Sequence, residues 1–143
     1  ELCIGIDLIT KRIDKAISKK EKRELPLLFF FKADALEFLQ SLPESLRIGK
    51  TVLLFPDPWP KRRHYKRRLI QQPFLDLLAD GSLPKAELFF RTDHDGYFTW
   101  ALEQINESAL WSMQSDFSWP LEHETFFQNI LPKHHSLLAI RSD

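Results

Sequence analysis

Cysteine is almost absent from this chain of 143 residues, and its scarcity excludes two kinds of stabilising site. Because Cys3 is the single cysteine, the chain forms no internal disulfide and no cysteine-rich zinc site. With 43% hydrophobic and 28% charged residues, its composition is that of a globular protein rather than a disordered one. We expect one domain covering residues 1–143, large enough to bury a core.

Long apolar runs are also missing. No stretch approaches the roughly 18 consecutive apolar residues of a membrane span, and nothing resembles a signal peptide. We therefore expect a cytoplasmic protein that does not enter a membrane. The pair His134-His135 has no cysteine or carboxylate at ligand spacing, so we expect no metal site. The sequence leaves the oligomeric state open between monomer and homodimer.

Positive charge is missing from one long segment and concentrated in two others. Residues 92–132 contain no Lys or Arg and seven Asp or Glu. Residues 61–68 contain six basic residues and no acidic one, and residues 11–24 contain seven basic and three acidic residues. A dipolar molecule of this kind can bind nucleic acid with one face despite a net charge of zero. The alternative, a solvated helix face, stays open, above all for residues 11–23.

Strand-like and helix-like segments alternate along the chain. We expect strands at residues 2–8, 27–31, 51–55, 87–91, 110–117 and 135–140, and helices at residues 11–23, 35–42, 66–79 and 93–107. The continuous apolar run at residues 27–31, with Phe29 and Phe31, is typical of a strand buried on both faces. Pro73 predicts a kink in its helix or a late start. The alternation predicts an α/β domain with a mostly parallel sheet.

Several expected strands end in a carboxylate, and these are Asp7, Asp34, Asp57 and Asp93. One such aspartate is weak evidence, because aspartate also caps helices. Ligands of open α/β sheets bind beyond the carboxyl ends of the strands. Four aspartates at strand ends therefore predict a polar site on one rim of the sheet.

The segment FPDPWPK, residues 55–61, carries the most specific signal in the chain. It places Asp57 at the end of a strand, in a proline-stiffened loop beside Trp59, and His64 and the basic residues follow. A carboxylate, an aromatic ring and a basic run together suggest that the protein holds a base of a polyanion against a reactive centre. This motif closely resembles the signature of the tRNA (guanine-N7-)-methyltransferases, which are class I methyltransferases that use S-adenosylmethionine.

Further segments resemble the same family along the chain. They are Gly5-Ile6-Asp7, Ala33-Asp34-Ala35, Arg91-Thr92-Asp93 with Tyr97 following, and Thr125-Phe126-Phe127-Gln128. The resemblance implies a Rossmann-like class I methyltransferase sheet, methylation of guanine N7 in tRNA, S-adenosylmethionine as cofactor and tRNA as partner.

The resemblance also implies a role for individual residues. Asp7 would hold the ribose hydroxyls of S-adenosylmethionine, and Asp34 and Ala35 would lie by its adenine. Asp57 would be the catalytic residue at the reaction centre, in contact with the cofactor as well. The implied substrate-binding residues are Lys61, Asp93, Thr125 and Gln128. The basic residues from Lys61 to Arg68 would mostly contact phosphates, which positions the substrate without reading its sequence.

Two features depart from the family. The family's first strand and its Gly-rich loop are missing, since the chain has four glycines and no GxGxG. We therefore expect an N-terminally incomplete methyltransferase domain. In addition, Gln128 stands where the family usually has Glu, which removes a charge and adds a hydrogen-bond donor.

Two other functions stay open. Methyltransferases that act on the exocyclic amine of a DNA or RNA base also use an acidic–proline–aromatic loop, although Pro60 and the basic run fit the N7 family better. A catalytically silent tRNA-binding remnant of the fold is favoured by the missing first strand. The retained Asp7, Asp34 and Asp57 argue against it. Trp59 either stacks on a base, lines the pocket or packs on the following helix.

Overall fold

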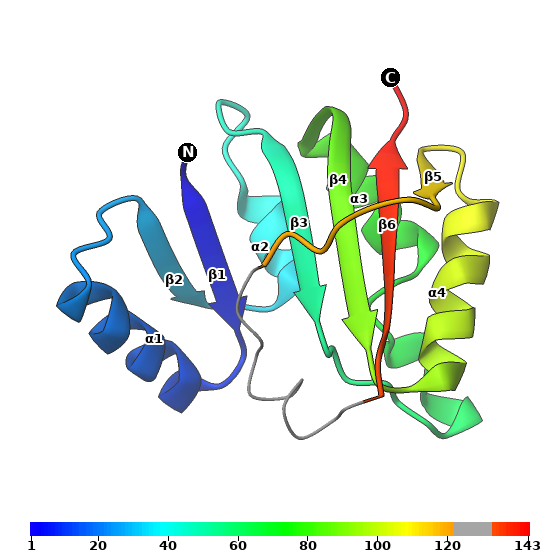
Figure 1. The fold of residues 1–143 in the computed structure, drawn as a ribbon, viewed down its shortest axis with the longest axis horizontal. Helices are drawn as coiled ribbons and strands as arrows, with labels where there is room; N and C mark the ends of the chain where they lie inside the picture. Colours follow the sequence, from blue (N-terminus) through cyan, green and yellow to red (C-terminus); the bar gives the residue numbers. More distant parts are fainter. Residues whose placement is uncertain (122–132) are drawn as a thin grey trace. The chain divides into compact units, whose positions relative to one another are not determined.

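The computed structural model of the chain describes residues 1–121 and 133–143. It divides into two compact units, Glu1–Pro43 and Glu44–Asp143, and each has a sheet of its own (Figure 1). Strands and helices alternate as the sequence predicted. The assignment of both units to a single methyltransferase domain stays a prediction.

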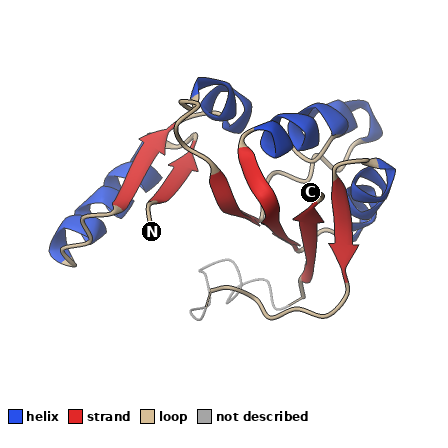
Figure 2. Ribbon diagram, turned by 90° about the horizontal axis from the view of Figure 1, so that it is seen from above, coloured by secondary structure: helices blue, strands red, loops and turns tan. Residues whose placement is uncertain are grey.

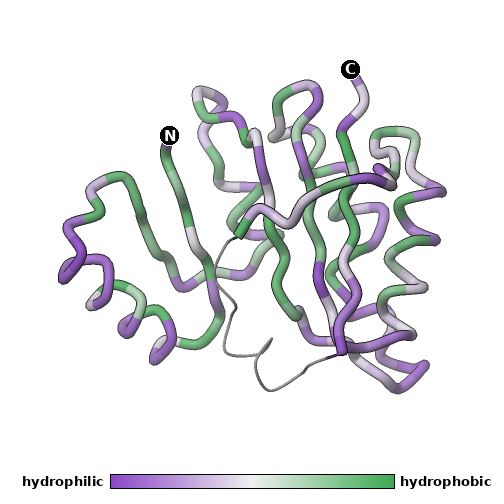
Figure 3. The backbone as a smooth tube through the Cα atoms, in the orientation of Figure 1, coloured by the Kyte–Doolittle hydropathy of each residue, from purple (hydrophilic) through white to green (hydrophobic). Residues whose placement is uncertain are grey.

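The unit Glu1–Pro43 is a strand–helix–strand–helix arrangement. Strands β1 (Cys3–Asp7) and β2 (Leu28–Lys32) are parallel and adjacent, and α1 (Thr10–Lys22) connects them. Helix α2 (Ala35–Ser41) follows β2. A helical crossover is the connection that parallel strands require, because a tight turn cannot reverse the chain twice. Both strands are apolar over most of their length (Figure 3).

The prediction that β2 is buried on both faces is wrong for this structure. Phe29 is 39% exposed and Phe31 is 47% exposed. The contacts of these rings inside the unit are limited: Lys20 of α1 lies over the Phe29 ring, and Phe38 of α2 lies beside Phe31. Two short helices do not enclose both faces of a two-stranded sheet, so apolar side chains of β2 remain accessible.

The unit Glu44–Asp143 contains a four-stranded sheet with the order β3-β4-β6-β5. Its strands are β3 (Ile48–Leu54), β4 (Ser82–Thr92), β5 (Trp111–Gln114) and β6 (His135–Arg141). Strands β3 and β4 are parallel, whereas β6 is antiparallel to both β4 and β5. The α/β class and the two closing strands are confirmed, and the closing strands make this sheet mixed.

Pro73 marks the beginning of a helix rather than a kink within one. A 3₁₀ helix, η1 (Arg62–Arg67), comes first, and α3 (Gln72–Asp80) begins with Pro73 in its first turn. Proline is tolerated there because the first amides of a helix have no intrahelical acceptor. The late start is therefore confirmed. Helix α4 (Asp95–Glu107) follows β4.

Helices and a loop cover opposite faces of the four-stranded sheet. Helices α3 and α4 lie on one face, and residues 115–121 cross the other (Figures 1 and 2). Successive residues of β4 point to these two faces in turn. Phe90 packs against Tyr97 of α4, and Phe89 packs against Phe117 and Trp119 of the loop. Strand β4 is therefore buried from both sides near its carboxyl end.

Tyr97 lies fully inside this core, in the first turns of α4. Its ring centroid is 5.1 Å from that of Phe90, and its hydroxyl accepts a hydrogen bond from the Ile70 amide at 3.2 Å. Burial raises the pKa of the Tyr97 phenol, because the interior disfavours the phenolate, and the negative charge of Asp57 adds to this effect. The amide of Ile70 and the charge of Arg68 act in the opposite direction without reversing it.

The raised pKa predicts a loss of stability in alkali. The folded protein holds the Tyr97 proton more tightly than the unfolded chain, so the free energy of unfolding falls as pH rises above the ordinary tyrosine pKa of about 10. Tyr97→Phe should make that decline shallower, as measured by denaturant unfolding across a pH series. Equal slopes for wild type and Tyr97→Phe would contradict the assignment.

Candidate functional site

The loop that leaves β3 is held in a strained conformation on both sides of Asp57. Its first residue, Phe55, donates its amide to the Arg91 carbonyl at 2.8 Å, which fixes the start of the loop against β4. Phe55 and Trp59 have positive φ angles of 47° and 44°. Left-handed backbone costs a non-glycine residue roughly 1–2 kcal/mol. Such strain persists only where surrounding contacts determine it, and it is typical of functional loops.

Asp57 presents an exposed carboxylate from the middle of this loop. In the part of the chain that the structure describes, this carboxylate has no hydrogen-bond or ion-pair partner. It nevertheless lies near enough to Tyr97 for its charge to help raise the pKa of that buried phenol. The Asp57 carboxylate therefore lies at the surface near the buried Tyr97, and its oxygens are available to accept hydrogen bonds from a ligand.

Trp59 packs on the following helix. Its ring lies edge-to-face with His64 at 5.8 Å between centroids, and the Arg67 guanidinium lies over it at 5.0 Å. Of the three predicted roles, packing on the following helix is the one that these contacts show. Trp59 thereby connects the Asp57 loop to η1.

The basic segment after the loop separates into exposed and buried cations. The exposed ones are Lys61, Arg62, Arg63, Lys66 and Arg67. Arg68, in contrast, is 2% exposed. The prediction that Arg68 contacts phosphate is therefore wrong, because aromatic rings and backbone carbonyls surround its guanidinium. Five exposed cations remain to meet a polyanion.

The loop after β4 leaves the same edge of the sheet and presents Asp93. Strands β3 and β4 are parallel neighbours, with Leu54 paired to Arg91, so the Asp57 and Asp93 loops begin side by side. The Thr92 hydroxyl accepts a hydrogen bond from the His94 amide at 3.2 Å. Asp93 itself is exposed. The structure thus brings these two predicted site residues to one rim.

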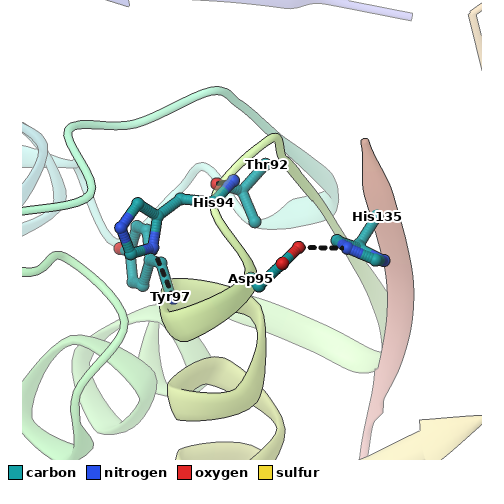
Figure 4. Close-up of polar contacts among 5 residues, drawn as sticks. All are labelled: Thr92, His94, Asp95, Tyr97 and His135. Carbon is teal, nitrogen blue, oxygen red and sulfur yellow. Dashed lines mark hydrogen bonds and ion pairs between the residues drawn. The ribbon is translucent and has the colours of Figure 1, made fainter. Parts of the chain in front are cut away.

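Two histidines fix the beginning of α4, which follows Asp93 in the chain, and Figure 4 shows both. The ring nitrogen Nδ1 of His94 caps α4 by accepting a hydrogen bond from the Tyr97 amide at 3.1 Å. Asp95 Oδ1 lies 2.7 Å from His135 Nε2 of β6. Since His135 also stacks on Phe98 of α4, the first turn of α4 is tied to the sheet.

Arg91 is a buried cation, which the sequence shows only as part of the segment Arg91-Thr92-Asp93. It is 7% exposed, its Nε donates to the Ser136 hydroxyl at 2.7 Å, and its guanidinium lies 3.7 Å from the centroid of the Trp119 ring. Burial lowers the pKa of its guanidinium. Its position at the end of an apolar run was the available signal for burial, because an arginine beside a strand core packs its stem there.

In the unit Glu1–Pro43, Asp7 closes β1 and retains part of its acceptor capacity. Its Oδ1 accepts from the Ile9 amide at 2.8 Å, and its Oδ2 accepts from Arg12 Nη1 at 3.3 Å. A carboxylate has about four acceptor positions, so both oxygens can accept again. This remaining capacity fits the two hydroxyls of a ribose. Asp7 also lines a cavity of about 240 Å³, together with Gly5, Ile6, Arg12, Ile13, Ala16 and Phe30.

Asp34 is the N-cap of α2, at the end of the neighbouring strand β2. Its Oδ1 accepts from the amides of Leu36 and Glu37 at 2.9 and 3.2 Å, which leaves Oδ2 for another donor. Ala35 is the first residue of that helix. An amino group, such as that of adenine, is a donor that Oδ2 fits.

The remaining predicted site residues have different outcomes. Thr125 and Gln128 lie outside the described residues. Asp7 and Asp34 lie together in one unit, and Asp57 and Asp93 lie together in the other, so the convergence of all four on one rim stays a prediction. Within residues 1–121 and 133–143, no three His, Cys, Asp or Glu side chains are grouped to hold a metal. No described helix has the length and apolarity to cross a membrane.

Comparison with known proteins gives the family. Residues 1–137 match a family model described as "Putative methyltransferase". The tRNA (guanine-N(7)-)-methyltransferase of Wolbachia pipientis is 35% identical over 118 residues, which are 82% of this chain and 53% of that protein. The chain spans about half the length of the curated relatives that it matches.

Solved structures give the fold. An rRNA methylase from Streptococcus thermophilus matches 99% of this chain and 74% of its own, with a TM-score of 0.67 and 7% identity. SMU.1697c of Streptococcus mutans, solved in complex with SAH, matches 98% of this chain and 76% of its own, with a TM-score of 0.63 and 9% identity. The class I methyltransferase fold is thereby confirmed. With the motif at residues 55–61 and a family model that covers residues 1–137, the chain belongs to this methyltransferase family, and its predicted resemblance to the tRNA (guanine-N7-)-methyltransferases is confirmed.

Proposed function

We propose that the protein methylates guanine N7 in tRNA, with S-adenosylmethionine as methyl donor. The observation that carries this proposal is the Asp57 loop. Its strained backbone presents an exposed carboxylate, with no hydrogen-bond or ion-pair partner among the described residues, directly before five exposed cations. Two relatives that the chain matches, at 35% and 38% identity, are tRNA (guanine-N(7)-)-methyltransferases. We propose tRNA as its partner and the cytoplasm as its location.

The chemistry requires positioning more than proton transfer. Guanine N7 carries a lone pair and no proton, so its attack on a methyl group needs no general base. S-adenosylmethionine supplies that methyl group as part of a sulfonium. The protein must hold N7 in line with the methyl group at near-attack distance. This lowers the barrier because the entropy cost of bringing the two reactants together is met on binding. Asp57 accepts hydrogen bonds from the N–H groups of guanine and favours the positive charge that develops on the base.

The cofactor is assigned to residues of Glu1–Pro43. Asp7 accepts from the ribose hydroxyls with the acceptor positions that Ile9 and Arg12 leave open. Asp34 holds the adenine amino group through Oδ2, and the backbone at Ala35 lies beside the base. These residues sit at the carboxyl ends of adjacent parallel strands, where ligands of open α/β sheets bind.

The tRNA is assigned to the exposed cations and to Asp93. Lys61, Arg62, Arg63, Lys66 and Arg67, which are exposed, contact phosphates, and the exposed Asp93 contacts the RNA substrate. Thr125 and Gln128 are proposed as further substrate contacts on the family resemblance alone. The phosphate contacts hold the RNA in register, while Asp57 selects the reacting base.

Removing the Asp57 carboxylate tests the proposed reaction. In the natural protein, Asp57→Ala should lower methyl transfer to tRNA by about 10²–10³-fold, the usual loss when one preorganised electrostatic group is removed. Retention of tRNA at low salt should stay nearly unchanged, because the phosphate contacts remain. The assay follows labelled methyl groups from S-adenosylmethionine into tRNA, and nuclease digestion with mass spectrometry identifies the methylated position.

Each outcome discriminates among the functions that the sequence leaves open. Methyl groups on an exocyclic amine would identify an amino-methyltransferase instead. Retention of tRNA without any binding of S-adenosylmethionine would identify a silent RNA-binding remnant. Loss of tRNA retention in Asp57→Ala, with normal turnover of bound substrate, would contradict the role of Asp57.

If the exposed cations contact phosphates, the affinity for tRNA should depend on salt, and each contact should add a measurable amount to that dependence. Each phosphate contact contributes about 0.7–0.9 log units of affinity per tenfold change in salt. Arg63→Met should therefore lower the slope of log affinity against log salt by about that amount. Lys85→Met removes an exposed cation that is paired with Asp143 at 3.7 Å, outside the basic segment, and should leave the slope unchanged. An unchanged slope in Arg63→Met would exclude its phosphate contact.

A further inference from the structure

Arg68 is a charged residue enclosed by the protein at the end of the basic segment. It is 2% exposed, whereas its neighbours Lys66 and Arg67 are exposed. Among the described residues it has no carboxylate partner. A buried, unpaired cation is costly, because no counter-charge replaces the water that it has lost.

Aromatic rings surround the Arg68 guanidinium on several sides. Its central carbon lies 3.8 Å from the Tyr65 ring centroid, 5.1 Å from that of Tyr97 and 5.4 Å from that of Trp100. Cation–π attraction of this kind offsets part of the desolvation cost. The Nη2 atom is nevertheless buried and has no hydrogen-bond partner among residues 1–121 and 133–143. An apolar side chain would fill this space without that cost, so stability alone does not explain an arginine here.

The hydrogen bonds of Arg68 join the Asp57 loop to α4. Its Nε donates to the Pro58 carbonyl at 2.8 Å, and its Nη1 donates to the Gly96 carbonyl at 3.4 Å. Pro58 directly follows Asp57 and directly precedes Trp59, whose backbone is left-handed. Gly96 lies in the first turn of α4, three residues after Asp93. One guanidinium therefore spans the two segments that carry Asp57 and Asp93.

We propose that Arg68 is a positioning residue, which holds the strained Asp57 loop in its reactive geometry by binding the Pro58 carbonyl from inside the core. The proposal rests on the proposed function, in which Asp57 orients guanine. Arg68 does not touch the substrate and acts only through the loop. A displacement of about 1 Å at a reacting group costs about 10²-fold in rate, so a modest relaxation of this loop is sufficient to slow methyl transfer.

The test compares three variants of the natural protein. Arg68→Met keeps the length of the side chain and removes the charge and both hydrogen bonds. Arg68→Lys keeps the charge but cannot bridge two carbonyls with a planar fork. Lys85→Met is the control, because Lys85 is an exposed cation outside the basic segment, paired with Asp143 at 3.7 Å. Far-UV circular dichroism and thermal unfolding establish that each variant is folded.

We expect Arg68→Met to lower kcat by about 100-fold, with KM for tRNA and the salt slope of tRNA binding unchanged. Arg68→Lys should recover part of that loss. Lys85→Met should retain the wild-type kcat, KM and salt slope. Hydrogen–deuterium exchange of the amides of residues 57–61 should be faster in Arg68→Met and unchanged in Lys85→Met.

Two results would overturn the proposal. A smaller salt slope and a raised KM in Arg68→Met, with normal kcat, would make Arg68 a phosphate contact. Wild-type kcat and wild-type hydrogen exchange in Arg68→Met would show that Arg68 is a packing residue only. If Arg68→Met does not fold, wild-type kcat and wild-type exchange in Arg68→Lys would lead to the same conclusion. If the wild-type protein transfers no methyl group to tRNA, the proposed function fails, while hydrogen exchange still tests whether Arg68 holds the loop.

Discussion

Strand β4 is the constraint on which the rest of Glu44–Asp143 depends, because it is buried on both faces and paired along both edges. The Arg91 carbonyl of β4 receives the Phe55 amide and so fixes where the Asp57 loop starts. Its last residue, Thr92, orients His94, and His94 caps α4. The positions of both rim aspartates therefore follow from the register of one strand.

The strain in the Asp57 loop requires contacts on more than one side. Left-handed conformations at Phe55 and Trp59 together cost a few kcal/mol, and this energy must come from surrounding interactions. The hydrogen bond to Arg91 holds the first residue. The packing of Trp59 on His64 and Arg67 holds the other end. Arg68 holds the middle through the Pro58 carbonyl, so the backbone is held on both sides of Asp57.

The element order could be predicted from the sequence because apolar runs and helix periodicity alternate clearly. The four aspartates that end strands were also visible, since they follow those runs directly. The left-handed backbone at Phe55 and Trp59 could not be predicted, because neither residue is a glycine. The burial of Arg68 was hidden because a run of cations normally indicates a solvated face. Only the apolar pair Leu69-Ile70 that follows it shows that the chain is entering the core.

The basic segment thus combines two kinds of interaction that differ in their response to salt: attraction by exposed cations and hydrogen bonds of the buried Arg68. Exposed cations act through a field that physiological salt screens over about 8 Å, so the attraction to tRNA that we propose for them weakens as salt rises. Arg68 acts inside the protein, where screening by ions is weak, and its bonds to Pro58 and Gly96 depend on geometry rather than on ionic strength. Lysine can replace arginine at an exposed phosphate contact with little loss, whereas a fork between two carbonyls requires the guanidinium. The proposed affinity for RNA and the proposed orientation of Asp57 therefore depend on the same eight residues, 61–68, through side chains that face opposite environments.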